Sequence, residues 1–245
     1  MTDRDPTFET THWSRIRRAS VQNDRDALQH LCQRYWYPLY CYLRRSGHTA
    51  DTAQDLVQGF FTELLQRQSL GKADPERGRF RNFLLTACRN HVANVHRADR
   101  AIRRGGEMKG HSLEIQQGEE RFSAEPASVQ TAERLFDRAW ALEIIDAAFA
   151  RVRQTYESKG RGERFDALSP LVTPTDAPPS HAQIADQLGC TPAAVKVAAF
   201  RLRQQFADAI REEIAATIDA DEPRQQEAMI DEELSELMTA LQVDT

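Results

Sequence analysis

The sequence lacks the features that mark membrane and secreted proteins. No stretch of its 245 residues approaches the roughly 18–20 apolar residues that a membrane-spanning helix needs, and no apolar segment with a basic flank opens it. Its cysteines, Cys32, Cys41, Cys88 and Cys190, include no CxxC pair, so we expect reduced thiols rather than disulfides or a four-cysteine zinc site. These absences predict a cytoplasmic protein with no membrane partner.

The motifs of common enzyme and metal sites are also missing. The sequence has no phosphate-binding glycine loop, no HExxH pair and no nucleophile elbow. Cys88 and His91 lie three residues apart on an expected helix, but His96 lies about 140° round that helix from His91, and no fourth ligand is evident. We therefore expect no catalytic activity, no metal and no cofactor.

Strand-like alternation of apolar and polar residues is absent, and helical periodicity takes its place. We expect helices over residues 25–45, 50–66, 80–103, 131–156 and 225–242, and two short helices that begin near Ser180 and Thr191. Pro38 lies within the first helix and predicts a kink or break there. Residues 105–130 show no periodicity and predict a flexible linker. The expected fold is all-α, with two small helical domains on either side of this linker.

The net charge of −5 conceals an uneven distribution. From Arg77 to Arg104 there are eight arginines and one acid, Asp99, whereas residues 219–245 contain nine acids and a single Arg224. A polyanion responds to local charge rather than to the average. The arginine-rich segment therefore predicts contact with nucleic-acid phosphates, which the acidic tail would repel.

Two short helices in the second half have clear start and stop signals. Ser180 and Gln183 have the spacing of a capping box, Gly189 suits a left-handed turn, and Thr191-Pro192 is a typical start for the next helix. Two helices joined by a short glycine-containing turn form a helix-turn-helix, whose second helix enters the major groove of DNA. The alternative is an ordinary helical hairpin with a solvated basic face.

Taken together, these motifs resemble the extracytoplasmic-function (ECF) subfamily of the sigma-70 family of bacterial sigma factors. Residues 35–43 are similar to the family's opening Tyr/Pro/Leu-Tyr helix, and residues 52–61 to its D-A-E-D-L-V-Q-E-x-F segment. Residues 78–90 resemble its G-x-F-R-x-W-L block, and residues 180–203 its reader of the promoter −35 element. The resemblance implies a promoter-specific initiation factor with no catalytic chemistry of its own.

The resemblance also implies a domain layout and a set of contact residues. It implies a domain at 12–104 that binds core RNA polymerase and the −10 element, a linker at 105–130, a helix-turn-helix domain at 131–218 and an acidic extension at 219–245. The implied contacts to the β′ clamp helices of the polymerase are Gln54, Asp55, Gln58 and Phe61. The implied contacts to melted −10 DNA are Arg77, Arg79, Arg81, Asn82, Arg89, Asn90, Asn94, Arg97 and Arg100. The implied contacts to −35 DNA are Thr191, Ala194, Lys196, Val197, Phe200, Arg201, Arg203 and Gln204.

Two other interpretations stay open at this point. One is a dimeric helix-turn-helix regulator that binds duplex DNA without being a polymerase subunit. The other is an interaction module without promoter recognition, suggested by Gly59 and Ala198, which stand where the family usually has Glu and Arg.

The acidic tail motivates a further hypothesis, because its charge is opposite to that of the arginine-rich segment. On this hypothesis, the tail helix binds the protein's own basic surface or a regulator such as an anti-sigma factor. The alternative is an additional helix that packs on the second domain.

Overall fold

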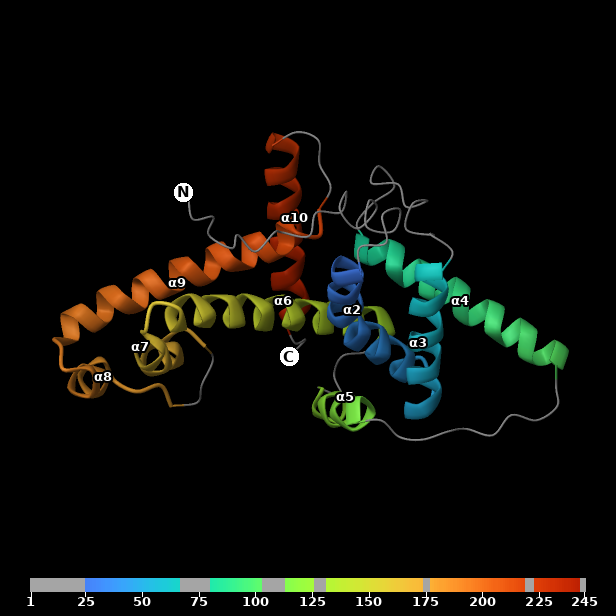
Figure 1. The fold of residues 1–245 in the computed structure, drawn as a ribbon, viewed down its shortest axis with the longest axis horizontal. Helices are drawn as coiled ribbons and strands as arrows, with labels where there is room; N and C mark the ends of the chain where they lie inside the picture. Colours follow the sequence, from blue (N-terminus) through green and yellow to red (C-terminus); the bar gives the residue numbers. More distant parts are fainter. Residues whose placement is uncertain are drawn as a thin grey trace, which may run out of the picture. The chain divides into compact units, whose positions relative to one another are not determined.

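The computed structural model describes residues 25–66, 80–102, 113–125, 131–173, 177–218 and 223–242, and it confirms the all-α class for them (Figure 1). In chain order, the elements are α2 (Arg25–Arg45), α3 (Ala50–Gln66), α4 (Phe80–Ile102), α5 (Leu113–Ala124), α6 (Ala132–Glu157), α7 (Gly162–Leu168), the 3-10 helix η3 (Ser169–Leu171), α8 (His181–Leu188), α9 (Pro192–Ala215) and α10 (Pro223–Leu241). None of the helices in these ranges has the length and apolar character needed to span a bilayer.

The chain groups into two compact units, and their boundary differs from the expected one. Unit 1 comprises Met1–Glu143 and Ala215–Thr245, and unit 2 comprises Ile144–Ile214. The division falls inside α6 and at the end of α9, not in the 105–130 segment. Residues 132–143 and the C-terminal helix fall in unit 1 with the first helices, and Arg81 of α4 contacts both Trp140 and Glu233.

Unit 1 is built on the pairing of α2 and α3. Leu56, Phe60 and Leu64 recur at four-residue steps along α3 and are all buried, which is why this segment forms an amphipathic helix against a core. Helix α2 continues through Pro38, so the break that was one of the expected outcomes there does not occur. Both helices have the bounds predicted from the sequence.

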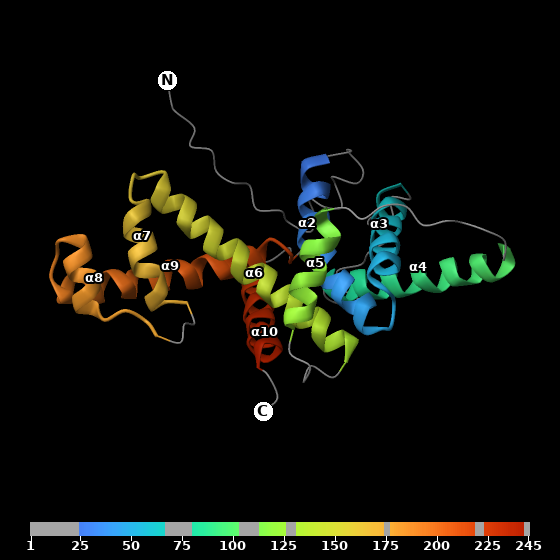
Figure 2. The ribbon, with the colours of Figure 1, turned by 90° about the horizontal axis from the view of Figure 1, so that it is seen from below.

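The segment expected to be a linker contains a helix, α5, which packs against α2 (Figures 1 and 2). Gly118 makes this close approach possible, because a Cβ at this position would lie 2.9 Å from the ring of Trp36. Glu119 accepts a hydrogen bond from the Tyr40 hydroxyl at 2.5 Å and pairs with Arg44 at 2.6 Å. The linker prediction was therefore wrong for residues 113–124, which dock through polar and aromatic contacts rather than through an apolar stripe.

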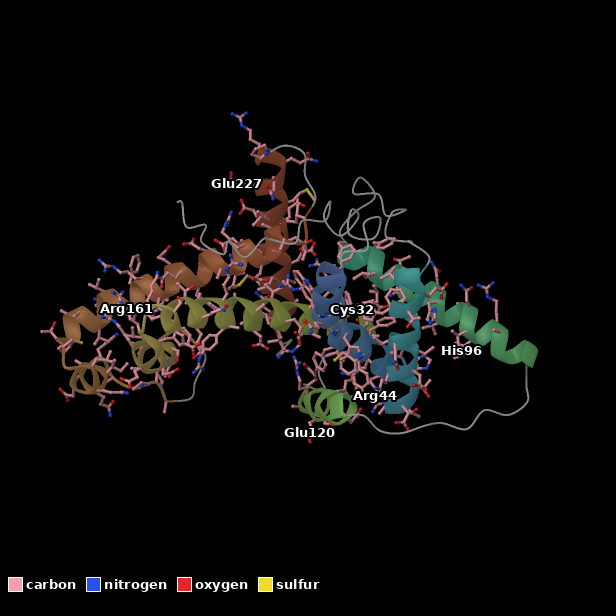
Figure 3. The ribbon with its side chains drawn as sticks, in the orientation of Figure 1. Cys32, Arg44, His96, Glu120, Arg161 and Glu227 are labelled. Atoms are coloured by element: carbon pink, nitrogen blue, oxygen red, sulfur yellow. The ribbon has the colours of Figure 1, made fainter. Side chains whose placement is uncertain are left out.

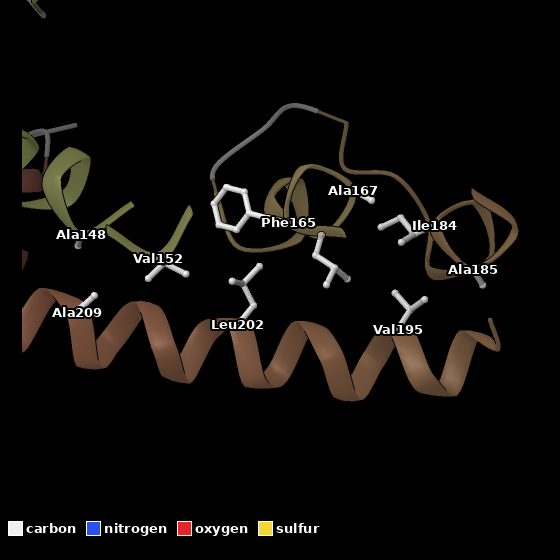
Figure 4. Packing of buried hydrophobic residues seen from close by; sticks show 10 residues of the cluster. Ala148, Val152, Phe165, Ala167, Ile184, Ala185, Val195, Leu202 and Ala209 are labelled. Carbon is white, nitrogen blue, oxygen red and sulfur yellow. The ribbon is translucent and has the colours of Figure 1, made fainter. Parts of the chain in front are cut away.

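Helices α6, α7, α8 and α9 contribute to an apolar core in unit 2 (Figure 4). Its buried residues are Ala148, Val152, Phe165, Ala167, Leu168, Ile184, Ala185, Val195, Leu202 and Ala209. Phe149 packs edge-on against Phe165 with ring centroids 5.0 Å apart. Because this core takes up one side of the first half of α9, the opposite side of that helix faces solvent.

Candidate nucleic-acid interface

The connection between α8 and α9 is short and tightly hydrogen-bonded. The Ser180 hydroxyl accepts a hydrogen bond from the backbone N–H of Gln183 at 3.3 Å. The side-chain oxygen of Gln183 in turn accepts one from the backbone N–H of Ser180 at 2.8 Å. These reciprocal bonds are the predicted capping box. Gly189 has a φ of 62°, in the left-handed region that glycine favours, and Thr191 accepts a hydrogen bond from the Ala194 amide at 3.2 Å. These local bonds fix where α8 ends and α9 begins.

Helix α9 separates an apolar inner face from a basic outer face. Val195, Ala199 and Leu202 are each 1% exposed and anchor the helix to unit 2. All eight residues that the sequence suggested for duplex DNA are exposed, namely Thr191, Ala194, Lys196, Val197, Phe200, Arg201, Arg203 and Gln204. The structure therefore brings this set together on the exposed side of α9 and on Thr191, the residue just before it.

Two features of the outer face of α9 bear on what it can bind. Val197 and Phe200 are 51% and 60% exposed and lie three residues apart on the helix, so they form a small apolar patch among the basic residues. The Arg203 guanidinium donates to the Leu171 carbonyl at 2.8 Å, which orients its stem. Guanidinium and ammonium donors beside an apolar patch can hydrogen-bond phosphates or guanine edges and contact thymine methyl groups.

The predicted −10 residues on α4 are exposed with one exception. Asn82, Arg89, Asn90, Asn94 and Arg97 all face solvent. Residues Arg77 and Arg79, together with the side chain of Arg100, lie outside the described part of the chain.

The exposed arginines of α4 are held in place by neighbouring groups. Arg89 donates to the Tyr42 hydroxyl at 2.9 Å and also pairs with Glu133. The bond to Tyr42 is the main reason that the pKa of Arg89 is raised. Arg97 donates to the Asn94 side chain at 2.6 Å. These side chains therefore present a partly ordered basic surface.

A cavity of about 430 Å³ opens between the end of α2 and the middle of α4. Tyr42, Arg89 and Arg97 line it together with His48 and His96, whose rings stack 5.5 Å apart (Figure 3 labels His96). Burial and, secondarily, the neighbouring His96 lower the pKa of His48, so the fold favours its neutral form. No sequence pattern indicates this cavity, because His48 lies on the turn after α2, far from His96 along the chain.

Arg81 is the exception on α4, because it is only 4% exposed. It donates to Glu233 at 2.5 Å and to Glu236, both on α10, and its Nε lies 3.6 Å from Asp137. Its guanidinium stacks over the Trp140 ring, 4.2 Å from the centroid. The expectation that Arg81 is open to DNA does not hold in this structure, because the acidic tail helix covers it.

The predicted polymerase-binding residues on α3 have different environments. Asp55 and Gln58 are exposed and Gln54 is partly exposed, whereas Phe61 is 6% exposed and belongs to the core of unit 1. A direct contact from Phe61 to a partner is therefore not available in this structure. The accessible part of the predicted set is polar.

Gly59, the departure from the family pattern on α3, has a structural explanation. A Cβ at this position would lie 3.3 Å from Nε2 of His91, and the other ring nitrogen of His91 is 2.5 Å from the Glu63 carboxylate. Because Gly59 has no side chain, the imidazole of His91 on α4 fits beside α3 and pairs there with Glu63.

The described residues offer no metal site. No group of three or more His, Cys, Asp or Glu residues in these ranges could hold a metal ion. Burial raises the pKa of the Cys88 thiol to about 12.

Comparisons with known proteins give no indication of function. The chain matches no protein-family model, and no curated protein or solved structure is significantly similar to it. What it does must therefore be argued from the two exposed surfaces on α4 and α9.

Proposed function

We propose that this protein is an ECF-type sigma factor that binds core RNA polymerase and directs transcription from specific promoters. On this proposal, α8 and α9 form a helix-turn-helix that reads duplex DNA at the −35 element. The exposed arginines and asparagines of α4 hold the melted −10 strand, and Asp55 and Gln58 on α3 contact the β′ clamp helices.

The observation that carries the proposal is the outer face of α9. A helix placed after a three-residue turn, held by a buried inner face and presenting Lys196, Arg201 and Gln204, has the donors that a recognition helix needs. An ordinary helical hairpin has no need for Val197 and Phe200 on the solvent side. Their exposure favours a surface that is covered by a partner.

The second support is the basic surface of unit 1. Arg89 and Arg97 lie on the same helix as Asn82, Asn90 and Asn94, and all five are exposed. Phosphates attract the arginines, and the amide groups of asparagine can hydrogen-bond unpaired bases. A surface with both kinds of group suits single-stranded DNA better than an ordinary protein partner.

The test is run-off transcription with purified core RNA polymerase on promoters upstream of the protein's own gene and its neighbours. We expect specific transcripts only when the protein is present. Arg201→Ala should abolish most of this signal, since losing a base contact costs about 1–3 kcal/mol of binding free energy. Arg164→Ala is the matched control, because Arg164 is an exposed arginine of unit 2 that lies on α7.

Binding measurements on the same purified protein distinguish this proposal from the dimeric regulator and the interaction module. A protein that binds duplex DNA as a dimer, without binding core polymerase, would be an ordinary regulator and would overturn the proposal. A protein that binds polymerase but supports no initiation on any of these promoters would be an interaction module instead.

A further inference from the structure

We infer that the cavity between the end of α2 and the middle of α4 is a binding site for one nucleotide. The base stacks on the rings of His48 and His96, and the phosphate pairs with Arg97. A free mononucleotide and a nucleotide of a DNA strand offer this same chemistry. For a nucleotide of a strand, the inference rests on the proposed function and gives melted DNA a definite contact on unit 1.

The cavity has the size and the lining of a small-ligand site. Its volume of about 430 Å³ lies within the range of roughly 300–1,000 Å³ that such sites occupy. Leu43, Val92 and Ala93 contribute apolar side chains to its wall, and the polar groups are few. This combination suits a ligand with a flat, mostly apolar ring and a separate charged group.

Two imidazole rings give the cavity a stacking surface. His48, on the turn after α2, and His96, on α4, lie nearly parallel, with 12° between the ring planes and 5.5 Å between the centroids. His96 is exposed and His48 is partly exposed, so other side chains do not enclose the pair. Unpaired bases stack on aromatic side chains, histidine included, and they do so with little dependence on the base. A base in the cavity therefore extends a stack that the fold has already formed.

Two arginines supply the positive charge. Arg97 donates to the Asn94 side chain and to the Ala93 carbonyl, and none of the carboxylates in the described part of the chain pairs with it. Arg89 pairs with Glu133, but the two side chains are 43% and 50% exposed, and a solvated pair of this kind contributes little to stability. Guanidinium groups bind phosphates through charge-assisted hydrogen bonds. A phosphate can therefore bind Arg97 beside the histidines without displacing a carboxylate.

The arrangement favours an anion and is not part of the core of unit 1. No acidic residue is among the described residues that line the cavity. His96 and Arg97 are both exposed, so the fold of unit 1 does not depend on burying them. Substitutions at these two positions can therefore test binding in a folded chain, and tryptophan fluorescence checks that each variant is folded.

The test titrates the full chain with deoxythymidine and deoxyadenosine 5′-monophosphates and follows the histidine ring signals by NMR. We expect the signals of His48 and His96 to shift, whereas that of His181, an exposed histidine on α8, stays unchanged. Inorganic phosphate and the two nucleosides should each bind at least about tenfold more weakly than the nucleotides, because each lacks one of the two contacts.

Matched variants separate stacking from charge. His96→Leu should weaken nucleotide binding about tenfold, whereas His96→Phe, which keeps a flat ring, should retain it. Arg97→Gln should also weaken binding about tenfold. Arg224→Gln removes the same charge from an exposed position on α10 and should change affinity by less than about twofold. Equal losses in the two arginine variants, or unchanged binding in His96→Leu, would overturn the inference.

An oligothymidylate of about ten nucleotides distinguishes the two sources of the ligand. A strand that shifts the same two histidine signals and binds more tightly than the mononucleotide, with concentrations counted per nucleotide, identifies the occupant as part of a strand. A strand that binds no more tightly identifies a free nucleotide. The absence of shifts at His48 and His96 with every probe at millimolar concentration would contradict the inference. None of these results decides the transcription assay, so the proposed function can stand when this inference fails.

Discussion

The ion cluster around Arg81 should stabilise α10 on unit 1, and Arg81→Met tests this. The Arg81 and Glu233 side chains are 4% and 6% exposed and lie 2.5 Å apart. Removing one member of a buried pair typically costs about 3–5 kcal/mol, because the other charge stays in a poorly solvated place. We expect the lower end, about 3 kcal/mol, since α10 can detach and return Glu233 to water.

The single variant Glu233→Leu and the double variant complete a double-mutant cycle. Arg81→Met/Glu233→Leu replaces the buried pair by apolar side chains and should recover most of the loss. Glu236 and Asp137 need no replacement, because their side chains remain 46% and 42% exposed. Glu133→Gln is the control, since the half-exposed pair of Glu133 with Arg89 should contribute less than about 1 kcal/mol.

The assay is urea unfolding followed by tryptophan fluorescence. Residues 144–214 contain no tryptophan, whereas Trp36 and Trp140 belong to unit 1, so the signal reports unit 1. A smaller dependence of the unfolding free energy on urea in Arg81→Met would show that α10 is already detached from unit 1 before unfolding. Less surface would then be newly exposed when unit 1 unfolds. A loss no larger than that of Glu133→Gln would refute the reasoning.

Three smaller effects follow from other contacts. Ser180→Ala should lower the stability of α8 by about 1 kcal/mol through loss of the capping box, measured by hydrogen exchange of its amides. Gly118→Ala should destabilise unit 1 in the same fluorescence assay, because overpacking against Trp36 by about 1–3 kcal/mol outweighs a helix-propensity gain of about 1 kcal/mol. The pKa of His48 is lower in the folded chain than its ordinary value of 6.5. As the pH falls below 6.5, His48 is therefore protonated more readily in the unfolded chain than in the folded one. Stability should therefore decrease as the pH falls below about 6.5, and His48→Gln should flatten that dependence; an unchanged slope would contradict this assignment.

Local patterns in the sequence determined much of the fold. The bounds of α2 and α3, the capping box at Ser180 and the turn at Gly189 follow from periodicity and from bonds between residues at most four positions apart. The exposure of the α9 residues follows in the same way, since burying Val195 and Leu202 directs the opposite face outward. The sequence was sufficient wherever the deciding interaction is local.

The packing of α5 and the burial of Arg81 depend on tertiary structure alone. Helix α5 is rich in residues with high helix propensity, but it contains Gly118 and has no apolar stripe that would reveal a packed helix in the sequence. Its contacts come from Trp36, Tyr40 and Arg44 on another helix. Arg81 had the sequence signature of an exposed cation, but its partner Glu233 is 152 positions away along the chain. Helical periodicity records which face of a helix is apolar. It contains no information on which distant charge the folded chain brings to that face, and that pairing determines which arginines of α4 remain exposed.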